Sequence, residues 1–187
     1  MHEIVDSNLP TAEKALGRVV DDVTTVTGAG FETTANVLRL VFYHVFSNAS
    51  ILQRLRAELA SAGGLPKSSP QMKVELRTLE QLPYLTSILM EGMRLSPAIA
   101  SRMTRIAPDR DIVYGEWNIP AGTPVGMMTL LMHTGETLYP EPMRFEPERW
   151  MDLDARKKAD KTYVPFSKGT RNCLGMQKVS ACSFAWQ

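Results

Sequence analysis

Residues 166–175, with the sequence FSKGTRNCLG, place a cysteine between two glycines and close to an arginine. Gly169 and Gly175 flank Cys173, and glycines at these spacings let the backbone turn tightly and approach a flat ligand. If a helix starts just after Cys173, its dipole and free N–H groups would stabilise the thiolate. Arg171 could pair with a carboxylate of the ligand. The alternative interpretation is a buried, inert cysteine in a turn.

An acid and a base lie three residues apart at Glu91 and Arg94, within a segment whose pattern predicts a helix. The i, i+3 spacing puts both side chains on one helix face, where they can pair. The alternative is an ordinary solvated pair. Further along the chain, residues 145–150 read FEPERW and supply a second arginine, Arg149.

Residues 28–36, with the sequence GAGFETTAN, interrupt an otherwise apolar helical pattern. Two glycines, a glutamate and two threonines are costly choices in the interior of a packed helix. Threonine hydroxyls can also bond back to the carbonyl one turn earlier, which is the alternative to a functional explanation.

Together these segments resemble the signatures of the cytochrome P450 family of heme-thiolate monooxygenases. Residues 166–175 match FxxGxRxCxG, residues 91–94 match ExxR, residues 147–150 resemble the PERF/PERW segment, and residues 29–34 resemble (A/G)GxxTT. The four segments occur in the family's order. The general texture of the sequence is similar to fungal secondary-metabolism members, including the trichodiene oxygenase-like group.

The resemblance implies that Cys173 is the axial thiolate ligand of the iron of heme b and that Phe166 and Gly175 contact the cofactor. A thiolate ligand pushes electron density onto the iron and favours O–O cleavage. Backbone N–H groups after Cys173 would modulate the sulfur. Arg171 and Arg105 are expected to hold heme propionates, with Arg102 as the competitor of Arg105.

On the other side of the heme, the resemblance implies that Ala29 and Gly30 leave room for O₂. Glu32 and Thr33 would form an acid–alcohol pair that delivers protons. Phe31 and Ala29 are expected to line a pocket for a lipophilic substrate, together with residues 98–101.

A structural brace is the expected role of the charged triad Glu91, Arg94 and Arg149, which in the family locks the coil that positions the heme cysteine. Removing one member would leave a buried charge unpaired. His133 has a neighbourhood rich in Met and Leu and is interpreted as a satisfied structural histidine. Cys182 is expected to be incidental.

The elements that must position these residues are mainly helical. Helices are predicted over residues 11–47, 51–60, 76–82 and 83–95, followed by a strand, a turn and a strand over residues 111–120. Thr11 is the expected N-cap of the first helix, and Pro83 suits the first turn of the fourth. The predicted fold is mainly α with a small β portion, a truncated C-terminal half of the cytochrome P450 fold. It forms one partial domain over residues 1–187.

The composition and charge of the chain argue against several other classes of protein. The 187 residues carry a net charge of +1 with dispersed basic residues, so we expect no nucleic-acid partner. No apolar stretch approaches the roughly 18 residues of a membrane span. The first residues lack the pattern of a signal peptide. Two cysteines are too few for a disulfide framework.

The resemblance covers nearly all of this chain but less than half of a typical family member. It implies a monooxygenase that inserts one oxygen atom from O₂ into a lipophilic small molecule, with electrons from a partner reductase. The alternative is a truncated, non-catalytic remnant of such an enzyme. Full-length relatives are held at the endoplasmic reticulum by a membrane anchor that we expect to be absent from these residues, so the location of this chain is open. The residues after Cys173 also depart from the family's pattern, because Lys178 stands where an apolar residue is usual.

Overall fold

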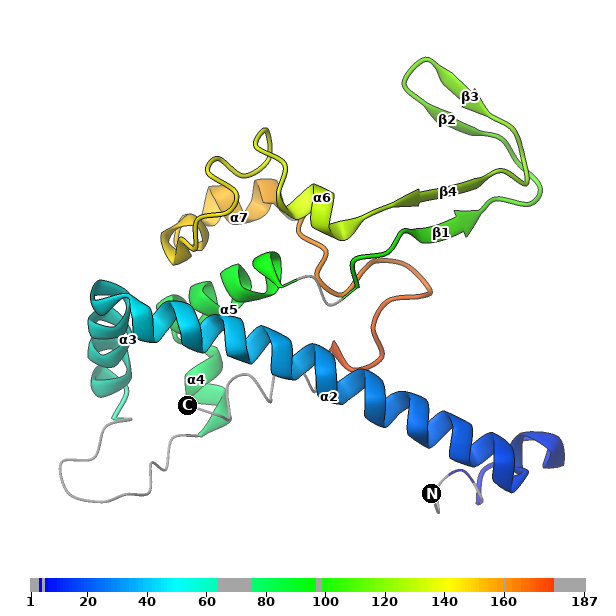
Figure 1. Cartoon of the computed structure of the whole chain (residues 1–187), viewed down its shortest axis with the longest axis horizontal. Helices are drawn as coiled ribbons and strands as arrows, with labels where there is room; N and C mark the ends of the chain where they lie inside the picture. The colour runs from blue at the N-terminus through cyan, green and yellow to red at the C-terminus, as the bar shows by residue number, and fades with distance from the viewer. Residues whose placement is uncertain (1–3, 5, 64–74, 97–98, 160, 177–187) are drawn as a thin grey trace.

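The computed structural model of the chain describes residues 4, 6–63, 75–96, 99–159 and 161–176. The described part is mostly helical and contains two small antiparallel pairs of strands, which confirms the predicted fold class (Figure 1). In chain order the elements are η1 (Thr11–Lys14), α2 (Leu16–Ser47), α3 (Ala49–Ser61), α4 (Leu76–Glu80), α5 (Pro83–Leu95), β1 (Met103–Ile106), β2 (Ile112–Tyr114), β3 (Trp117–Ile119), β4 (Pro124–Met127), α6 (Thr129–His133), η2 (Pro147–Trp150) and α7 (Leu153–Ala159).

The long helix α2 has 32 residues and runs diagonally below α6, α7 and the strands in Figure 1. It begins at Leu16, so the expectation that Thr11 caps it is wrong. Thr11 instead begins the 3₁₀ turn η1, and no side-chain hydrogen bond caps either element. Ala15 separates the two because its ψ of 137° is extended rather than helical.

Helix α5 lies across α2 and forms the centre of the core. Pro83 occupies its first turn, and its bounds agree with the predicted ones. A small residue permits a close crossing, because a Cβ added to Gly92 would lie 2.2 Å from Cγ2 of Val41. The buried core is apolar and comes mainly from these two helices and α3; it includes Val37, Val41, Val45, Leu55, Leu85, Ile88 and Leu89.

Helices α3 and α5 are each capped by a side chain that lies outside the helix it caps. Asn48 Oδ1 accepts hydrogen bonds from the backbone N–H groups of Ser50 and Ile51 and starts α3. Glu58 of α3 caps α5: its two carboxylate oxygens accept from the backbone N–H groups of Tyr84 and Leu85, each at 2.8 Å. Because the N-cap residue of α5 makes no side-chain cap, Glu58 satisfies donors that would otherwise lack a partner.

The strands form an arm that extends away from the helices (Figure 1). β1 pairs with β4, from Met103 opposite Met127 to Ile106 opposite Pro124. The hairpin of β2 and β3 continues this arm. It confirms the strand, turn and strand predicted over residues 111–120. Gly115 in its turn has a φ of +59°, a conformation that favours glycine.

Apolar side chains remain exposed on α2. Phe31, Tyr43 and Phe46 have relative exposures of 67%, 68% and 66%. Between residues 37 and 46 of this helix, the buried side chains are those of Val37, Val41 and Val45, which share one face. No helix among the described residues is both long and apolar enough to cross a membrane.

Candidate functional site

A cavity of about 210 Å³ brings the cysteine loop and the unusual part of α2 together. Cys173, Phe166 and Arg171 line it from the loop, and Ala29 and Thr33 line it from α2. The sequence segments that carry the two signatures are more than a hundred residues apart, and the fold places residues of both in the lining of one cavity. Its remaining walls are largely apolar and include Val37, Met93, Ile99, Met103 and Leu130.

The loop that holds Cys173 is closed by its own backbone. The N–H of Cys173 donates to the carbonyl of Phe166 at 3.0 Å, and the N–H of Asn172 donates to that of Gly169 at 3.1 Å. Gly169 has a φ of +83°, which explains a glycine there. Cys173 itself is exposed, so it is not the buried cysteine of the alternative interpretation. The helix expected after it lies mostly outside the described residues, which end at residue 176, and Gly175 does not line the cavity.

The α2 wall is an unbroken helix at residues 28–36. The hydroxyl of Thr33 donates to the carbonyl of Ala29 at 2.7 Å, which is the back-bonding of the alternative interpretation. Thr33 nevertheless lines the cavity, whereas Glu32 and Gly30 are exposed and are not among its lining residues. Proton delivery by Glu32 and Thr33 stays a prediction.

Arg171 and Arg105 line different cavities. Arg171 belongs to the first, and Arg105 to a second cavity of about 500 Å³. The two cavities share the lining residues Met103, Thr129 and Ser167. Arg105 is exposed, with its guanidinium donating to the carbonyl of Thr104 at 3.0 Å, and Arg102 lines neither cavity. The expectation that Arg105 or Arg102 contacts a propionate stays a prediction.

Phe31 does not line the pocket expected for it. It is two residues after Ala29, and on a helix this spacing turns the side chain to nearly the opposite face. Of the substrate loop predicted over residues 98–101, Ile99 lines the first cavity, whereas Ala98 lies outside the described residues.

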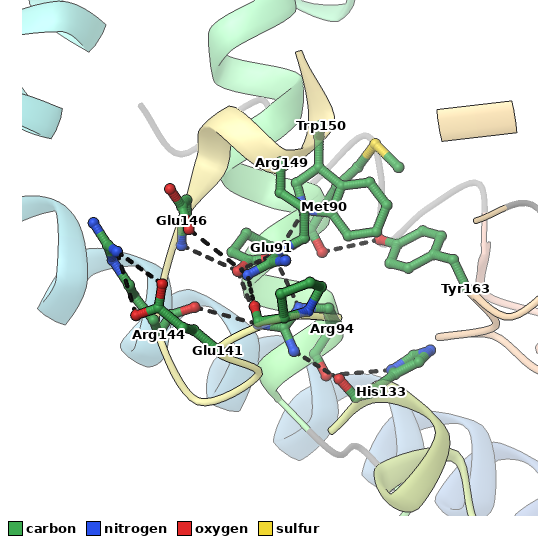
Figure 2. Close-up of polar contacts among 11 residues, drawn as sticks. Met90, Glu91, Arg94, His133, Glu141, Arg144, Glu146, Arg149, Trp150 and Tyr163 are labelled. Atoms are coloured by element: carbon green, nitrogen blue, oxygen red, sulfur yellow. Dashed lines mark hydrogen bonds and ion pairs between the residues drawn. The ribbon is translucent and has the colours of Figure 1, made fainter. Parts of the chain in front are cut away.

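Figure 2 shows the predicted triad, with Arg94 and Arg149 close to the carboxylate of Glu91. Both carboxylate oxygens of Glu91 accept from the guanidinium of Arg94 at 2.8 Å, and both side chains are fully buried. Arg149 completes the triad as an ion pair, with its Nε 3.6 Å from Oε1 of Glu91. Arg149 also donates a hydrogen bond to the carbonyl of Pro140 at 2.9 Å. The predicted contacts of the triad are confirmed, and its role in positioning the cysteine loop stays a prediction.

Further donors to Glu91 were not predicted from the sequence. The indole N–H of Trp150 donates to Oε2 at 2.8 Å, and the backbone N–H of Glu146 donates to Oε1 at 3.0 Å. Arg94 in turn donates to the backbone carbonyls of His133 at 2.6 Å and Arg144 at 3.3 Å. The signal that could have indicated Trp150 is its indole, since a buried Trp usually needs an acceptor.

His133 is a satisfied structural histidine, as predicted. Its Nδ1 lies 3.2 Å from the carbonyl of Arg94, and its Nε2 accepts from the N–H of Val164 at 3.0 Å. Burial lowers the pKa of His133 to about 4, so the imidazole is neutral at pH 7. Burial also raises the pKa of Tyr163, whose ring stacks on His133 and whose hydroxyl donates to the carbonyl of Met90.

Comparison with known proteins places this geometry in a family. The family model described as "Cytochrome P450" matches residues 12–177. The "Cytochrome P450 monooxygenase tndB" of Aspergillus flavipes is 41% identical over 93% of this chain and 35% of its own length. The "Fusicoccadiene C-8 hydroxylase" of Phomopsis amygdali is 38% identical over 93% of this chain and 32% of its own length. The "Cytochrome P450 monooxygenase TRI4" of Fusarium sporotrichioides is 39% identical over 92% of this chain and 32% of its own length.

The chain thus spans about a third of the length of the curated relatives it matches. The matches confirm the resemblance to fungal monooxygenases and to the trichodiene oxygenase-like group. With the family model covering residues 12–177, and with the cysteine loop, the α2 segment and the buried triad in place, the chain belongs to the cytochrome P450 family.

Proposed function

We propose that this chain is the heme-ligating part of a monooxygenase that inserts one oxygen atom from O₂ into a lipophilic small molecule. A partner reductase would supply the electrons. One observation carries the proposal: Cys173 faces the same cavity as Ala29 and Thr33 of α2, so a cofactor bound through the sulfur would meet the helix that carries the second family signature.

The residues present fit heme iron rather than a bare metal ion. Within the described part of the chain, no group of three or more His, Cys, Asp or Glu side chains could hold a metal. Heme iron suits such a site, because the porphyrin supplies four of the iron's ligands and Cys173 would supply one more. The thiolate would supply electron density that promotes O–O cleavage.

The chain's own residues have distinct proposed tasks. Cys173 binds the iron, and Phe166 and Gly175 belong to the loop that holds it. Arg171 carries a positive charge at the cavity for a propionate, and Arg105 does so at the neighbouring cavity. Thr33 can release its back-bond to Ala29 and pass a proton, with Glu32 as the exposed acid next to it. Ala29 and Gly30 keep this wall free of bulk.

The substrate class is proposed from the cavity walls. Val37, Met93, Ile99 and Leu130 offer apolar contacts, which suit a lipophilic molecule. The name of one relative specifies hydroxylation of fusicoccadiene at C-8, and this agrees with the proposed reaction class without identifying the substrate of this chain.

A non-catalytic form is the second candidate, and the exposed apolar side chains of α2 favour it. Phe31, with 67% exposure, lies on nearly the opposite face of α2 from Ala29. An apolar surface of this kind indicates that the described residues leave this face of α2 uncovered.

Addition of hemin to the 187-residue chain, reduction under carbon monoxide and measurement of the Soret band separate the candidates. A thiolate-type spectrum supports heme ligation, and free-hemin behaviour supports the non-catalytic form. Cys173→Ala should abolish the thiolate spectrum. Cys182→Ala is the matched control, since these are the only two cysteines, and it should leave the spectrum unchanged. Unchanged heme affinity and spectrum in Cys173→Ala would overturn the proposal.

A further inference from the structure

His133 lies where the buried brace meets the segment that leads to Cys173 (Figure 2). Its relative exposure is 2%. Its ring stacks on that of Tyr163 at 5.6 Å and meets the edge of Tyr139 at 6.3 Å between ring centroids. Three segments therefore converge on this side chain: α5 through Arg94, the end of α6, and the chain before the cysteine loop.

The hydrogen bonds of His133 admit a single neutral tautomer. The carbonyl of Arg94 can only accept, so Nδ1 must carry the proton in their 3.2 Å contact. The N–H of Val164 can only donate, so Nε2 must be the acceptor in their 3.0 Å contact. A third bond runs the other way, from the guanidinium of Arg94 to the backbone carbonyl of His133 at 2.6 Å.

We propose that His133 is the positioning residue that connects the Glu91–Arg94 brace to the cysteine loop. Val164 lies two residues before Phe166, and the carbonyl of Phe166 accepts from the N–H of Cys173 at 3.0 Å. The connection thus runs from Arg94 through both ring nitrogens of His133 to Val164, and from there along the chain to the loop. This role rests on the proposed function of Cys173.

A neighbouring contact anchors the same segment but does not replace His133. The hydroxyl of Tyr163 donates to the carbonyl of Met90 at 3.1 Å. This bond holds residue 163 against α5, whereas the direction of the backbone N–H of the next residue is set by His133. The charged and titratable groups around the imidazole are Glu91 and Arg94 from α5 and the phenols of Tyr139 and Tyr163.

Hydrogen exchange of the Val164 amide, measured in the full chain with no heme added, tests the connection from Arg94 through His133 to Val164. His133→Phe keeps an aromatic ring but removes both ring nitrogens, and the Val164 amide should exchange roughly tenfold faster. His133→Gln offers a carbonyl oxygen in place of Nε2 and should stay within about twofold of wild type. His44→Phe is the control: His44 stacks on Phe145 at 4.4 Å but makes no hydrogen bond within the described residues.

A second measurement links the amide to the sulfur. In the heme-loaded full chain, reduced under carbon monoxide, His133→Phe should convert at least half of the thiolate-type band to the thiol-type band at equal heme content. His133→Gln and His44→Phe should retain it. A merely structural loss would reduce heme uptake in proportion without changing the ratio of the two bands.

The outcomes separate this proposal from the proposed function. If wild type shows the thiolate band and His133→Phe changes neither the band ratio nor the exchange of the Val164 amide, the role of His133 is overturned and that of Cys173 stands. If wild type shows no thiolate band, the function of Cys173 fails, and the positioning role fails with it even where Val164 exchange depends on His133. If His133→Phe unfolds, which loss of amide protection throughout α5 would show, the test rests on His133→Gln. That variant must then retain both the slow exchange of the Val164 amide and the thiolate-type band.

Discussion

At the scale of single residues, Glu91 is the buried anion with which Arg94 and Arg149 form ion pairs. Its carboxylate is fully buried and accepts four hydrogen bonds, two from Arg94 and one each from Trp150 and the backbone of Glu146. The Nε of Arg149 adds an ion pair at 3.6 Å without a hydrogen bond. A buried ion pair contributes little net stability when it is intact, but it is costly to break because the remaining charge stays buried.

Replacing Glu91 and replacing one of its donors should therefore have different costs. Glu91→Gln leaves two arginines without an anion and should lower the free energy of unfolding by about 3–5 kcal/mol. Trp150→Phe removes one donor and should cost about 1–3 kcal/mol. Urea unfolding of both variants measures which one loses more free energy of unfolding. Equal costs would show that Glu91 acts as a neutral hydrogen-bond acceptor.

Protonation of His133 should make stability depend on pH. Its pKa is about 4 in the folded chain and about 6.5 in an unfolded one. Between these values the unfolded state binds more protons, so the free energy of unfolding falls as pH decreases, by at most about 1.4 kcal/mol per pH unit. Because His44 and the carboxylates also titrate, the informative quantity is the difference between wild type and His133→Gln. That difference should shrink as pH falls from 6.5 to 4, and a constant difference would contradict the lowered pKa of the buried imidazole.

At the scale of elements, the close crossing of α2 and α5 depends on the absence of a side chain at position 92. The nearest atom to an added Cβ is Cγ2 of Val41, at 2.2 Å. Val41 is fully buried and branched at Cβ, so it has few alternative positions. The helix that carries Glu91 and Arg94 is thereby held against the helix that carries Thr33.

Gly92→Ala should destabilise the chain by about 1–3 kcal/mol through overpacking. Gly17→Ala, at a helical glycine with nothing within 4 Å of the added Cβ, should be neutral or stabilising. Combining Gly92→Ala with Val41→Ala should give a smaller loss than the sum of the two single losses, because the second change removes the clashing atom. Additive losses in urea unfolding would place the strain elsewhere.

Local patterns predicted the elements well and their junctions less well. Pro83 lies in the first turn of α5 and indicates where that helix starts, and the strand, turn and strand predicted over residues 111–120 correspond to β2 and β3. The start of α2 was missed because it depends on the extended backbone of Ala15 rather than on a capping side chain. The cap of α5 was not predictable either, since Glu58 comes from a different helix.

The candidate site, too, has features that local sequence predicts and features that depend on distant residues. Glu91 and Arg94 were predictable as a pair because a helix sets their distance, and Cys173 because its flanking glycines are part of one loop. The bonds of Trp150 and His133 to this pair cross 59 and 39 residues of chain, and no local spacing indicates them. Family resemblance connected Arg149 to the brace, but only the fold shows that Phe31 is turned away from the cavity.

At the scale of the whole molecule, the last turns of α2 present apolar side chains to solvent. Tyr43 and Phe46 have exposures of 68% and 66% and are three residues apart, so they share one face. Their burial against a second surface would release water from apolar area, which favours association.

The isolated 187-residue chain should therefore self-associate, and Phe46→Lys should weaken this association. A lysine near the C-terminal end of a helix is also favoured by the helix dipole, so the fold should persist. Ser47→Lys is the matched control, because it adds the same charge at an exposed position without removing apolar area. Sedimentation velocity over a range of concentrations measures the effect. A monomeric wild-type chain at every concentration, or equal association of the two variants, would show that this face of α2 does not drive contact between copies.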